Sequence, residues 1–448
     1  MSEWRKVKIG AFLKERQGKH KPDAPAIAGL KRLNKIDFSG RIHLSDKPTK
    51  TDMIIVHSGD LVISGINVAK GAIAVHQGVE PIAATIHYST YEFNDSLIDI
   101  DFLKRFLKSP AFMSALKEQT KGGIKTEIKA KNLLSIVVKL PELTEQKAIN
   151  QKFHAFENEL VALASEISNQ QTYLAKLRQS ILQEAIEGKL TADWRAAHPV
   201  CLGDPNTDAA ALLATIQTEK QTLIAQGKLK KEKLLPPISN NEMPFALPEG
   251  WVWVRLGEII KESPRNGYSP KEVSYPTTVK SLKLGATTLG VFNPNKFKYI
   301  DEHIPEDSYL WLENGDILIQ RSNSMDYVGV SAIYLGEKNR FIYPDLMMKM
   351  QIFPPLTAFF AHLSLSAFTT RQYFRRQAKG AQTSMPKINQ HTVANTLLAF
   401  PSLAEQHAIV ERVDRLLASV NALEQQVAER QRHAEQLMQA VLKEAFAG

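Results

Sequence analysis

The 448-residue sequence predicts an α+β fold in which each of two globular domains is followed by one long helix of a coiled coil. Three observations predict this fold. One segment of the chain occurs twice, the repeated segment has the apolar spacing of a coiled coil, and the regions before it alternate short Val/Ile-rich runs with helical patterns. We expect the long helices to run antiparallel, which would separate the globular domains and relate the two halves by a pseudo-two-fold axis.

The repeat is clearest in the helical segment. Residues 141–188 align with 401–448 without a gap, and 15 of the 48 positions are identical at a constant offset of 260. Average composition would give a match at about one position in sixteen, so chance does not explain the alignment. The globular regions match more loosely, for example at 59–63 and 315–319, and their offset drifts from 247 to 258. The domains therefore contain insertions, whereas the helix keeps its length.

The apolar residues of the repeated segment follow alternating steps of four and three, which is typical of a coiled-coil seam. In the first copy they run from Ile149 to Ile181, and the second copy repeats them 260 residues later. The pattern is interrupted by a polar residue at aligned positions, Gln170 and Arg430. This shared interruption predicts that the two helices pair with each other. A core helix within one large domain is the alternative that the spacing leaves open.

These patterns predict the domain organisation. The expected segments are a first domain at 1–140, a first helix at 141–188, a connector at 189–247, a second domain at 248–400 and a second helix at 401–448. In the domains we expect strands at 53–56, 61–63, 252–256 and 317–319 and helices at 102–119 and 358–378. The connector should contain a helix from about Thr207 to Gly227, followed by a solvated lysine-rich stretch.

Charge is distributed unevenly along the chain. The formal net charge is +9, with +9 on residues 1–140 and +4 on 248–400, whereas 141–188 and 401–448 carry −3 and −2. A polyanion such as double-stranded DNA would therefore be engaged by the globular domains. The single cysteine, Cys201, excludes a disulfide framework and predicts a cytoplasmic protein. No apolar run approaches the roughly 18 residues of a membrane helix, so we expect no membrane partner.

Candidate DNA-binding residues lie in loops that occur in both copies and combine glycine with Arg, Asn, Gln or Lys. Arg, Asn and Gln can each make paired hydrogen bonds to the edge of a purine. In the first domain the candidates are Arg16, Lys19, Ser64, Asn67, Lys70, Lys121, Lys125 and Thr126. In the second domain they are Arg265, Asn266, Tyr268, Gln320, Arg321, Ser322, Asn323, Lys379, Gln382, Thr383, Ser384 and Lys387. For any single residue, an ordinary polar loop is the alternative.

The sequence does not predict a catalytic site, a metal site or a cofactor in this chain. It contains neither a phosphate-binding loop nor the Asn-Pro-Pro-aromatic segment expected of an enzyme that methylates exocyclic amines. Its 12 histidines show no metal-ligand spacing. A stand-alone DNA-modifying enzyme and a coiled-coil scaffold that never contacts DNA remain the alternatives to a DNA-recognition subunit.

Three segments indicate a family. The pattern Pro-x-Leu-x-Glu-Gln-x-Ala-Ile occurs at 141–149 and again at 401–409. The segment Gly-Lys-Leu-Thr-Ala-Asp-Trp-Arg occupies 188–195, and the segment Leu-Pro-Glu-Gly-Trp occupies 247–251. With them the chain resembles, over nearly its whole length, the specificity subunits of type I restriction-modification enzymes. Because copy one has Gly65 at the place aligned with Arg321, the resemblance does not establish the individual reading residues.

The resemblance implies that each globular domain reads one half of an asymmetric bipartite DNA site, while the helices set the spacing and dock the modification subunits. It also implies the other members of a DNA-methylation and host-defence complex. These are a pair of modification subunits with S-adenosylmethionine and a pair of restriction subunits that use ATP and Mg²⁺.

Overall fold

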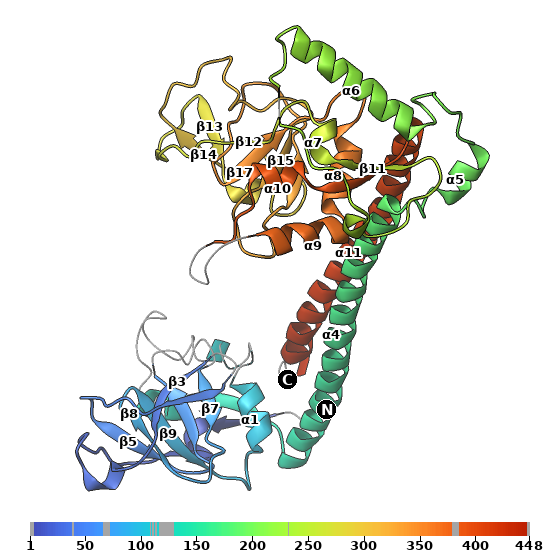
Figure 1. Ribbon diagram of the computed structural model, residues 1–448. Helices are drawn as coiled ribbons and strands as arrows, with labels where there is room; N and C mark the ends of the chain where they lie inside the picture. The colour runs from blue at the N-terminus through green and yellow to red at the C-terminus, as the bar shows by residue number, and fades with distance from the viewer. Residues whose placement is uncertain are drawn as a thin grey trace. The chain divides into compact units, whose positions relative to one another are not determined.

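A computed structural model describes residues 4–37, 40–65, 72–107, 109, 112, 114–115, 130–231, 233–378 and 385–445. The chain packs into two compact units. Unit 1 comprises Met1–Asn169 and Val427–Gly448, and unit 2 comprises Gln170–Gln426. The two long helices, α4 (Leu143–Ile186) and α11 (Leu403–Ala445), each contribute to both units (Figure 1). In the described part of the chain, none of the helices combines the length and apolar character needed to cross a membrane.

The globular part of unit 1 is built on two sheets of four strands. One has the order β2-β9-β6-β7 and is antiparallel throughout, and the other, β4-β3-β8-β5, contains the parallel pair β3 and β8. Strand β1 pairs with β10 in a separate ladder. The strands are β1 (Arg5–Lys8), β2 (Leu13–Glu15), β3 (Arg32–Ile36), β4 (Ile42–Ser45), β5 (Met53–Val56), β6 (Leu61–Ser64), β7 (Ile73–Val75), β8 (Ile82–Thr85), β9 (Tyr88–Phe93) and β10 (Val137–Leu140). The described helices are α1 (Ile100–Phe106) and α3 (Ala130–Ser135).

The globular part of unit 2 has one sheet of four strands, β12-β17-β15-β16, and two ladders of two strands, β11 with β18 and β13 with β14. Its strands are β11 (Val252–Arg255), β12 (Arg265–Asn266), β13 (Val279–Leu282), β14 (Phe297–Ile300), β15 (Ile317–Gln320), β16 (Ser331–Ile333), β17 (Met347–Met350) and β18 (Leu397–Phe400). Its helices, besides parts of α4 and α11, are α5 (Ala192–Ala197), α6 (Ala209–Ala225), α7 (Leu256–Ile259), α8 (Ala358–Ser366), α9 (Phe368–Gln377) and α10 (Gln390–Ala394).

The two units repeat one strand order. The sheet β2-β9-β6-β7 of unit 1 corresponds strand for strand to β12-β17-β15-β16 of unit 2. The central strands β6 and β15 lie at the offset of 256 that the sequence alignment predicts. Each follows a glycine with a left-handed backbone, Gly59 with φ 84° and Gly315 with φ 87°. The α+β fold and its internal duplication are therefore confirmed, as are the four predicted strands.

The central strand of each unit is buried on both faces. In β6, Leu61 and Ile63 belong to a core cluster with the α1 helix, whereas Val62 belongs to a second cluster with β5 and β8. Strand β15 shows the same alternation, because Leu318 packs in a different cluster from its two neighbours. Successive side chains of a strand point to opposite faces, so a wholly apolar strand needs cover on both sides.

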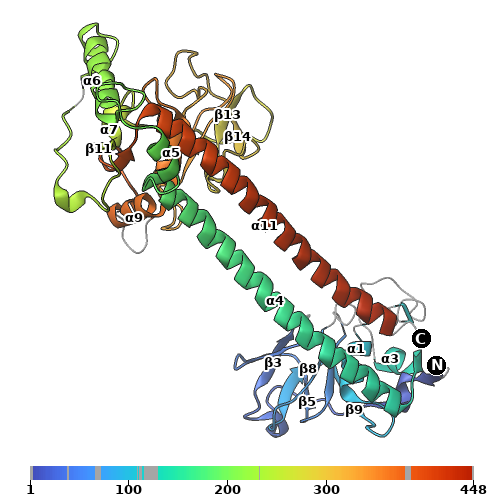
Figure 2. The same cartoon turned by 90° about the vertical axis from the view of Figure 1, so that its right-hand side faces the viewer.

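The long helices pair in an antiparallel manner. In unit 2, Arg178 of α4 donates hydrogen bonds to Asn421 and, at 2.9 Å, to Glu424 of α11. Further along the chain the backbone carbonyl of Leu190 accepts from Arg412. Partner numbers fall along α11 as numbers rise along α4, and both views show the helices side by side (Figures 1 and 2). In unit 1, Val441 of α11 packs against the core cluster that contains Phe153 of α4.

The two apolar lines of the predicted seam are buried to different extents. The more buried line consists of Phe153, Ile167, Leu174 and Ile181 on α4 and Val413, Val420 and Val427 on α11. The second line is buried at Ile409, near the start of α11, but four of its leucines, Leu163 and Leu177 on α4 and Leu423 and Leu437 on α11, are 37% to 47% exposed. Two helices packed along one ridge leave the other ridge at the surface, which a seam pattern alone does not reveal.

Two predicted helices differ from the structure. The single helix expected at 358–378 is two helices, because Ala367 between them is extended (φ −65°, ψ 150°). Gln183 of α4 accepts hydrogen bonds from the backbone and the hydroxyl of Thr369, which satisfies the exposed start of α9. Within the range expected at 102–119, α1 begins at Ile100 and ends at Phe106, where the Ser109 hydroxyl donates to the Phe106 carbonyl at 2.7 Å. Residues 112, 114 and 115 are helical again, and 108, 110, 111, 113 and 116–119 lie outside the described residues.

The segment 189–247 is more than a connector. Helix α6, close to the range predicted for it, buries Leu212 and Ile216 in the main core of unit 2. The ammonium of Lys220 donates to the backbone carbonyls of Gly257 and Ile260 at 3.1 and 2.8 Å. The described lysines of the stretch that follows α6 are exposed, as predicted. The connector therefore folds as part of the second unit.

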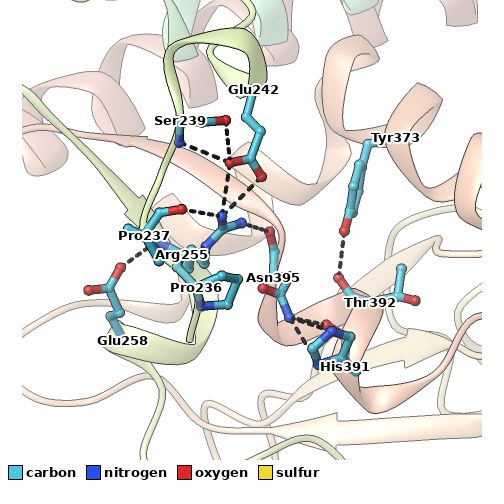
Figure 3. A network of polar contacts seen from close by, with 10 residues as sticks. All are labelled: Pro236, Pro237, Ser239, Glu242, Arg255, Glu258, Tyr373, His391, Thr392 and Asn395. Atoms are coloured by element: carbon cyan, nitrogen blue, oxygen red, sulfur yellow. Dashed lines mark hydrogen bonds and ion pairs between the residues drawn. The ribbon is translucent and has the colours of Figure 1, made fainter. Parts of the chain in front are cut away.

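Arg255 anchors the end of this segment (Figure 3). Its guanidinium is buried and donates to the carbonyls of Pro236 and Pro237, at 2.7 and 3.2 Å, and to that of Asn395 at 3.2 Å. It also forms a two-oxygen contact with the carboxylate of Glu242 at 3.0 and 3.1 Å. One side chain thus joins the connector to the first strand and to the end of α10.

We expect Arg255→Ala to lower the free energy of unfolding of unit 2 by about 2 to 4 kcal/mol, because it removes a buried guanidinium that binds three backbone carbonyls and one carboxylate. Urea unfolding followed by tryptophan fluorescence measures this, since four of the five tryptophans lie in unit 2. Glu242→Gln is the matched control and should cost less than about 1 kcal/mol, because this carboxylate is largely exposed. Equal effects of the two substitutions would contradict the anchoring role.

Candidate nucleic-acid interface

A buried aspartate precedes the central strand of each unit and shapes the turn that leads into it. Asp60 accepts a hydrogen bond from the backbone N–H of His57 at 2.9 Å, and Asp316 accepts the equivalent bond from Glu313 at 2.7 Å. Because Ser64 ends β6 and Gln320 ends β15, the two turns place these equivalent candidates at the same end of equivalent sheets.

The charged partners of the two aspartates differ. Asp60 accepts from Arg16 Nε at 2.7 and 2.9 Å, whereas Asp316 forms an ion pair with Lys349 at 3.3 Å and accepts from Gln351 at 2.7 Å. Burial raises the pKa of Asp316, and the Lys349 ammonium acts in the opposite direction. The equivalent turns are therefore held by different cations, Arg16 directly after β2 in unit 1 and Lys349 within β17 in unit 2.

Arg16 and Arg265 occupy equivalent positions but have different surroundings. Arg16 lies opposite Thr90 of β9, and Arg265 lies opposite Lys349 of β17. Besides Asp60, the Arg16 guanidinium contacts the carboxylate of Glu92. Arg265 instead lies over the ring of Tyr309, at 3.8 Å from its centroid, and is 45% exposed. The geometry supports a structural role for Arg16 and leaves Arg265 at the surface.

We expect Arg16→Ala to destabilise the central sheet of unit 1 by about 2 to 4 kcal/mol, because the buried carboxylate of Asp60 loses its charged partner. Arg265→Ala should change the stability of unit 2 by less than about 1 kcal/mol, since exposed cation–π and ion-pair contacts are weak. Hydrogen exchange of the β6 and β15 amides measures both. Similar losses of protection in the two variants would overturn the distinction.

Three of the predicted segments of unit 2 meet around residues 343–346. The backbone N–H of Tyr268 donates to the carbonyl of Tyr343 at 2.9 Å, and that of Arg321 donates to Leu346 at 2.8 Å. Ile388, next to Lys387, donates to the carbonyl of Arg321 at 3.0 Å. Segments that are more than 50 residues apart in the sequence thus form one surface at the end of the sheet.

Individual candidates on this surface are placed differently. Arg321 is half-buried, Lys387 is exposed, and the Tyr268 hydroxyl donates to Glu302 at 3.0 Å. Gln320 and Ser322 are fully buried, so their side chains do not reach the surface in this structure. Asn323 is half-buried and donates to Gln320 Oε1 at 2.6 Å. The Oδ1 atom of Asn266 is buried and has no hydrogen-bond partner among the described residues.

In unit 1 the structure places three of the eight candidates. Lys19 is exposed, Ser64 is buried at the end of β6, and Arg16 lines an open cleft together with Gln17 and His57. The other five, and four from unit 2, lie outside the described residues. They are Asn67, Lys70, Lys121, Lys125 and Thr126 in unit 1 and Lys379, Gln382, Thr383 and Ser384 in unit 2.

Sequence reasoning missed two groups of residues. Arg371 and Arg375, on α9, donate to carbonyls of the loop that follows β15. Their spacing of four residues on a helix was the available signal.

The second group is a Trp–Glu contact that occurs in both units. In unit 1 the indole N–H of Trp4 donates to Glu145 at 3.2 Å. Its counterpart in unit 2 is Trp251 with Glu405 at 2.8 Å. Identity of both residues in both copies was the signal for this contact.

Within the described ranges, no group of three or more His, Cys, Asp or Glu side chains is placed to hold a metal ion. The surface around residues 343–346 of unit 2 consists of loops with Arg, Lys, Tyr and amide side chains. Such side chains contact phosphates and the edges of bases.

Comparisons with known proteins also point to proteins that recognise DNA. Residues 248–430 match the family model described as the type I restriction modification DNA specificity domain. The chain is 30% identical over 245 residues to the specificity subunit of the type I restriction enzyme EcoEI from Escherichia coli. That alignment covers 53% of this chain and only 39% of the length of the relative.

Solved structures match over the whole chain at the level of the fold. The HsdS subunit from Thermoanaerobacter tengcongensis has a TM-score of 0.54 at 18% identity, covering 100% of this chain and 97% of that one. A chain from a structure on complex assembly and conformational transition of the type I R-M system has a TM-score of 0.60 at 16% identity, with coverages of 99% and 97%. Residues 248–430 are thus similar to a type I restriction modification DNA specificity domain, and the whole chain shares the fold of the HsdS subunit.

Proposed function

We propose that this chain is the non-catalytic subunit that recognises DNA in a type I restriction-modification complex. Each globular domain reads one half of an asymmetric bipartite site. One observation carries this proposal: both units have the same strand order, yet equivalent positions after the central strand hold different side chains, such as Gly65 and Arg321. A duplicated scaffold with different loops is suited to reading two different sequences.

The charge distribution supports contact between the domains and DNA. The net charges of +9 on residues 1–140 and +4 on 248–400 favour association with the phosphate backbone, which fixes the register of the protein on the duplex. The bases are then read in the major groove, where each base pair presents a distinct pattern of donors and acceptors.

The helix pair is proposed to set the distance between the half-sites. Helix α4 is continuous over 44 residues and α11 over 43, so their length is an intrinsic ruler. Deleting one heptad from each helix removes about 10 Å of rise and should shorten the unread spacer by about three base pairs. Sequencing of the methylated sites would show this change, and an unchanged spacer would contradict the ruler.

The exposed line of the helix pair supports docking of modification subunits. Leu177 and Leu423 lie in unit 2, and their repeat equivalents Leu437 and Leu163 lie in unit 1. Each unit therefore presents the same kind of apolar surface, which suits two copies of one partner. In this proposal the modification subunits carry S-adenosylmethionine and the restriction subunits use ATP and Mg²⁺, within the cytoplasm.

We expect the double substitution Leu177→Asp with Leu423→Asp to reduce the number of modification subunits bound from two to one, because charge is costly in an apolar contact. Native mass spectrometry of the assembled complex measures this number. Leu202→Asp, at a residue that is 88% exposed in the connector, is the matched control and should leave two subunits bound. Retention of both subunits by the double variant would place the docking surface elsewhere.

The function itself is tested by mapping methylated bases in DNA exposed to the complete complex. We expect a two-part motif with unlike halves, and replacement of residues 1–140 by another recognition domain should change one half only. Methyl transfer by the purified chain alone would instead indicate a stand-alone enzyme. Failure to bind any duplex, even with partners present, would indicate a scaffold.

A further inference from the structure

The loop that follows β15 in unit 2, residues 321–329, has a fixed backbone. At its base, the buried amide of Gln320 donates to the carbonyl of Leu284 at 3.1 Å and to the hydroxyl of Thr287 at 3.0 Å. Its oxygen accepts from Asn323, whose own oxygen accepts from the backbone N–H of Ser324 at 2.8 Å. Gln320 and Asn323 are thus engaged in holding the loop.

The far end of the loop is closed by Gly329. Its φ is 76°, and a Cβ at this position would lie 2.6 Å from the ring of Phe374. Its backbone N–H donates to the carbonyl of Gln320 at 2.7 Å, so the loop begins and ends at neighbouring points. Glycine is required here both by the left-handed backbone and by the lack of space.

Two arginines of α9 hold the middle of the loop. Arg371 donates to the carbonyl of Val328 at 2.6 Å and to that of Asp326 at 2.9 Å. Arg375 donates to the carbonyl of Met325 at 3.2 Å. Burial lowers the pKa of Arg371 to about 10, so the side chain remains charged at neutral pH. Three carbonyls of one short loop are therefore bound by one helix.

The side chains between these anchors point outward. Ser324 and Asp326 are exposed, Met325 is 47% exposed and Tyr327 is 40% exposed. The cations near them are Arg321 at the start of the loop, Arg375 on α9, and Lys387, which pairs with Ser322 in an isolated β-bridge. A single carboxylate among cations can approach a polyanion without net repulsion.

We propose that residues 324–327 form the base-reading tip of the second domain and that Arg371 is the positioning residue that holds this tip. The inference rests on the proposed function and names the part of the surface that determines specificity. Asp326 would accept a hydrogen bond from an exocyclic amino group in the major groove, that of cytosine or adenine. Met325 would contact the methyl group of a thymine. Gln320 and Asn323, which the sequence singled out, support the tip.

The first test uses Asp326→Asn in the complete complex, with methylated sites mapped by sequencing. An amide both donates and accepts, so discrimination at one position of one half-site should fall by about tenfold or more. The position that relaxes identifies the base as cytosine or adenine. The other half-site should be unchanged. Asp307→Asn, at an exposed carboxylate of the same domain, is the matched control and should leave the motif intact.

The second test uses Arg371→Lys, which keeps the charge but loses the planar fork whose two nitrogens each donate to a different carbonyl of the loop. It should weaken discrimination at several positions of the same half-site without changing the other half. Arg376→Lys is the control on the same helix, because Arg376 donates to Gln372 and not to the loop. The thermal unfolding midpoint shows whether either variant is folded.

The outcomes separate the inference from the function. A wild-type complex that methylates no defined motif would contradict the proposed function. A defined wild-type motif that Asp326→Asn leaves unchanged would overturn the assignment of the tip, while the function stands. Equal loss at both half-sites in a folded Arg371→Lys variant would overturn the positioning role. Should Arg371→Lys fail to fold, the Asp326→Asn result decides.

Discussion

Both globular domains depend on a central strand that is buried on both faces. Strands β6 and β15 are wholly apolar except at their last residue, and each is covered by separate core clusters on its two sides. A change inside such a strand disturbs two cores at once, so variation is tolerated where the strand ends. The buried aspartate and the left-handed glycine before each strand fix where it starts.

Because the central strand is constrained on both faces, the strand and the loops that follow it have different roles. The turn at Asp60 or Asp316 and the packed strand form the repeated part of the molecule, and the loops after the strand differ between the copies. The contacts of Trp4 with Glu145 and of Trp251 with Glu405 join each domain to the start of its own long helix. In unit 2 the Glu405 carboxylate also accepts from the Thr191 hydroxyl at 2.7 Å and contacts Arg195, which ties the end of α4 to the same point.

Much of the fold could be predicted from the sequence, because repeats and apolar spacing are local patterns. The pairing of the two long helices was predicted from one polar interruption at aligned positions, Gln170 and Arg430. The candidate site was less predictable, since burial decides the role of a polar residue and burial is a tertiary property. Arg16 and Arg265 align, yet only Arg16 meets a buried carboxylate. The residues around Ala367 do not predict a helix break, because the start of the second helix is stabilised by Gln183, which is distant in the sequence.

The central claim is that one scaffold, used twice, reads two unlike half-sites on one duplex. Base-interference footprinting of the complete complex on its own methylated site tests this claim most directly. We expect two separate clusters of essential bases, which differ in sequence and are separated by base pairs whose modification has no effect. A single continuous cluster, or two clusters of identical sequence, would contradict it.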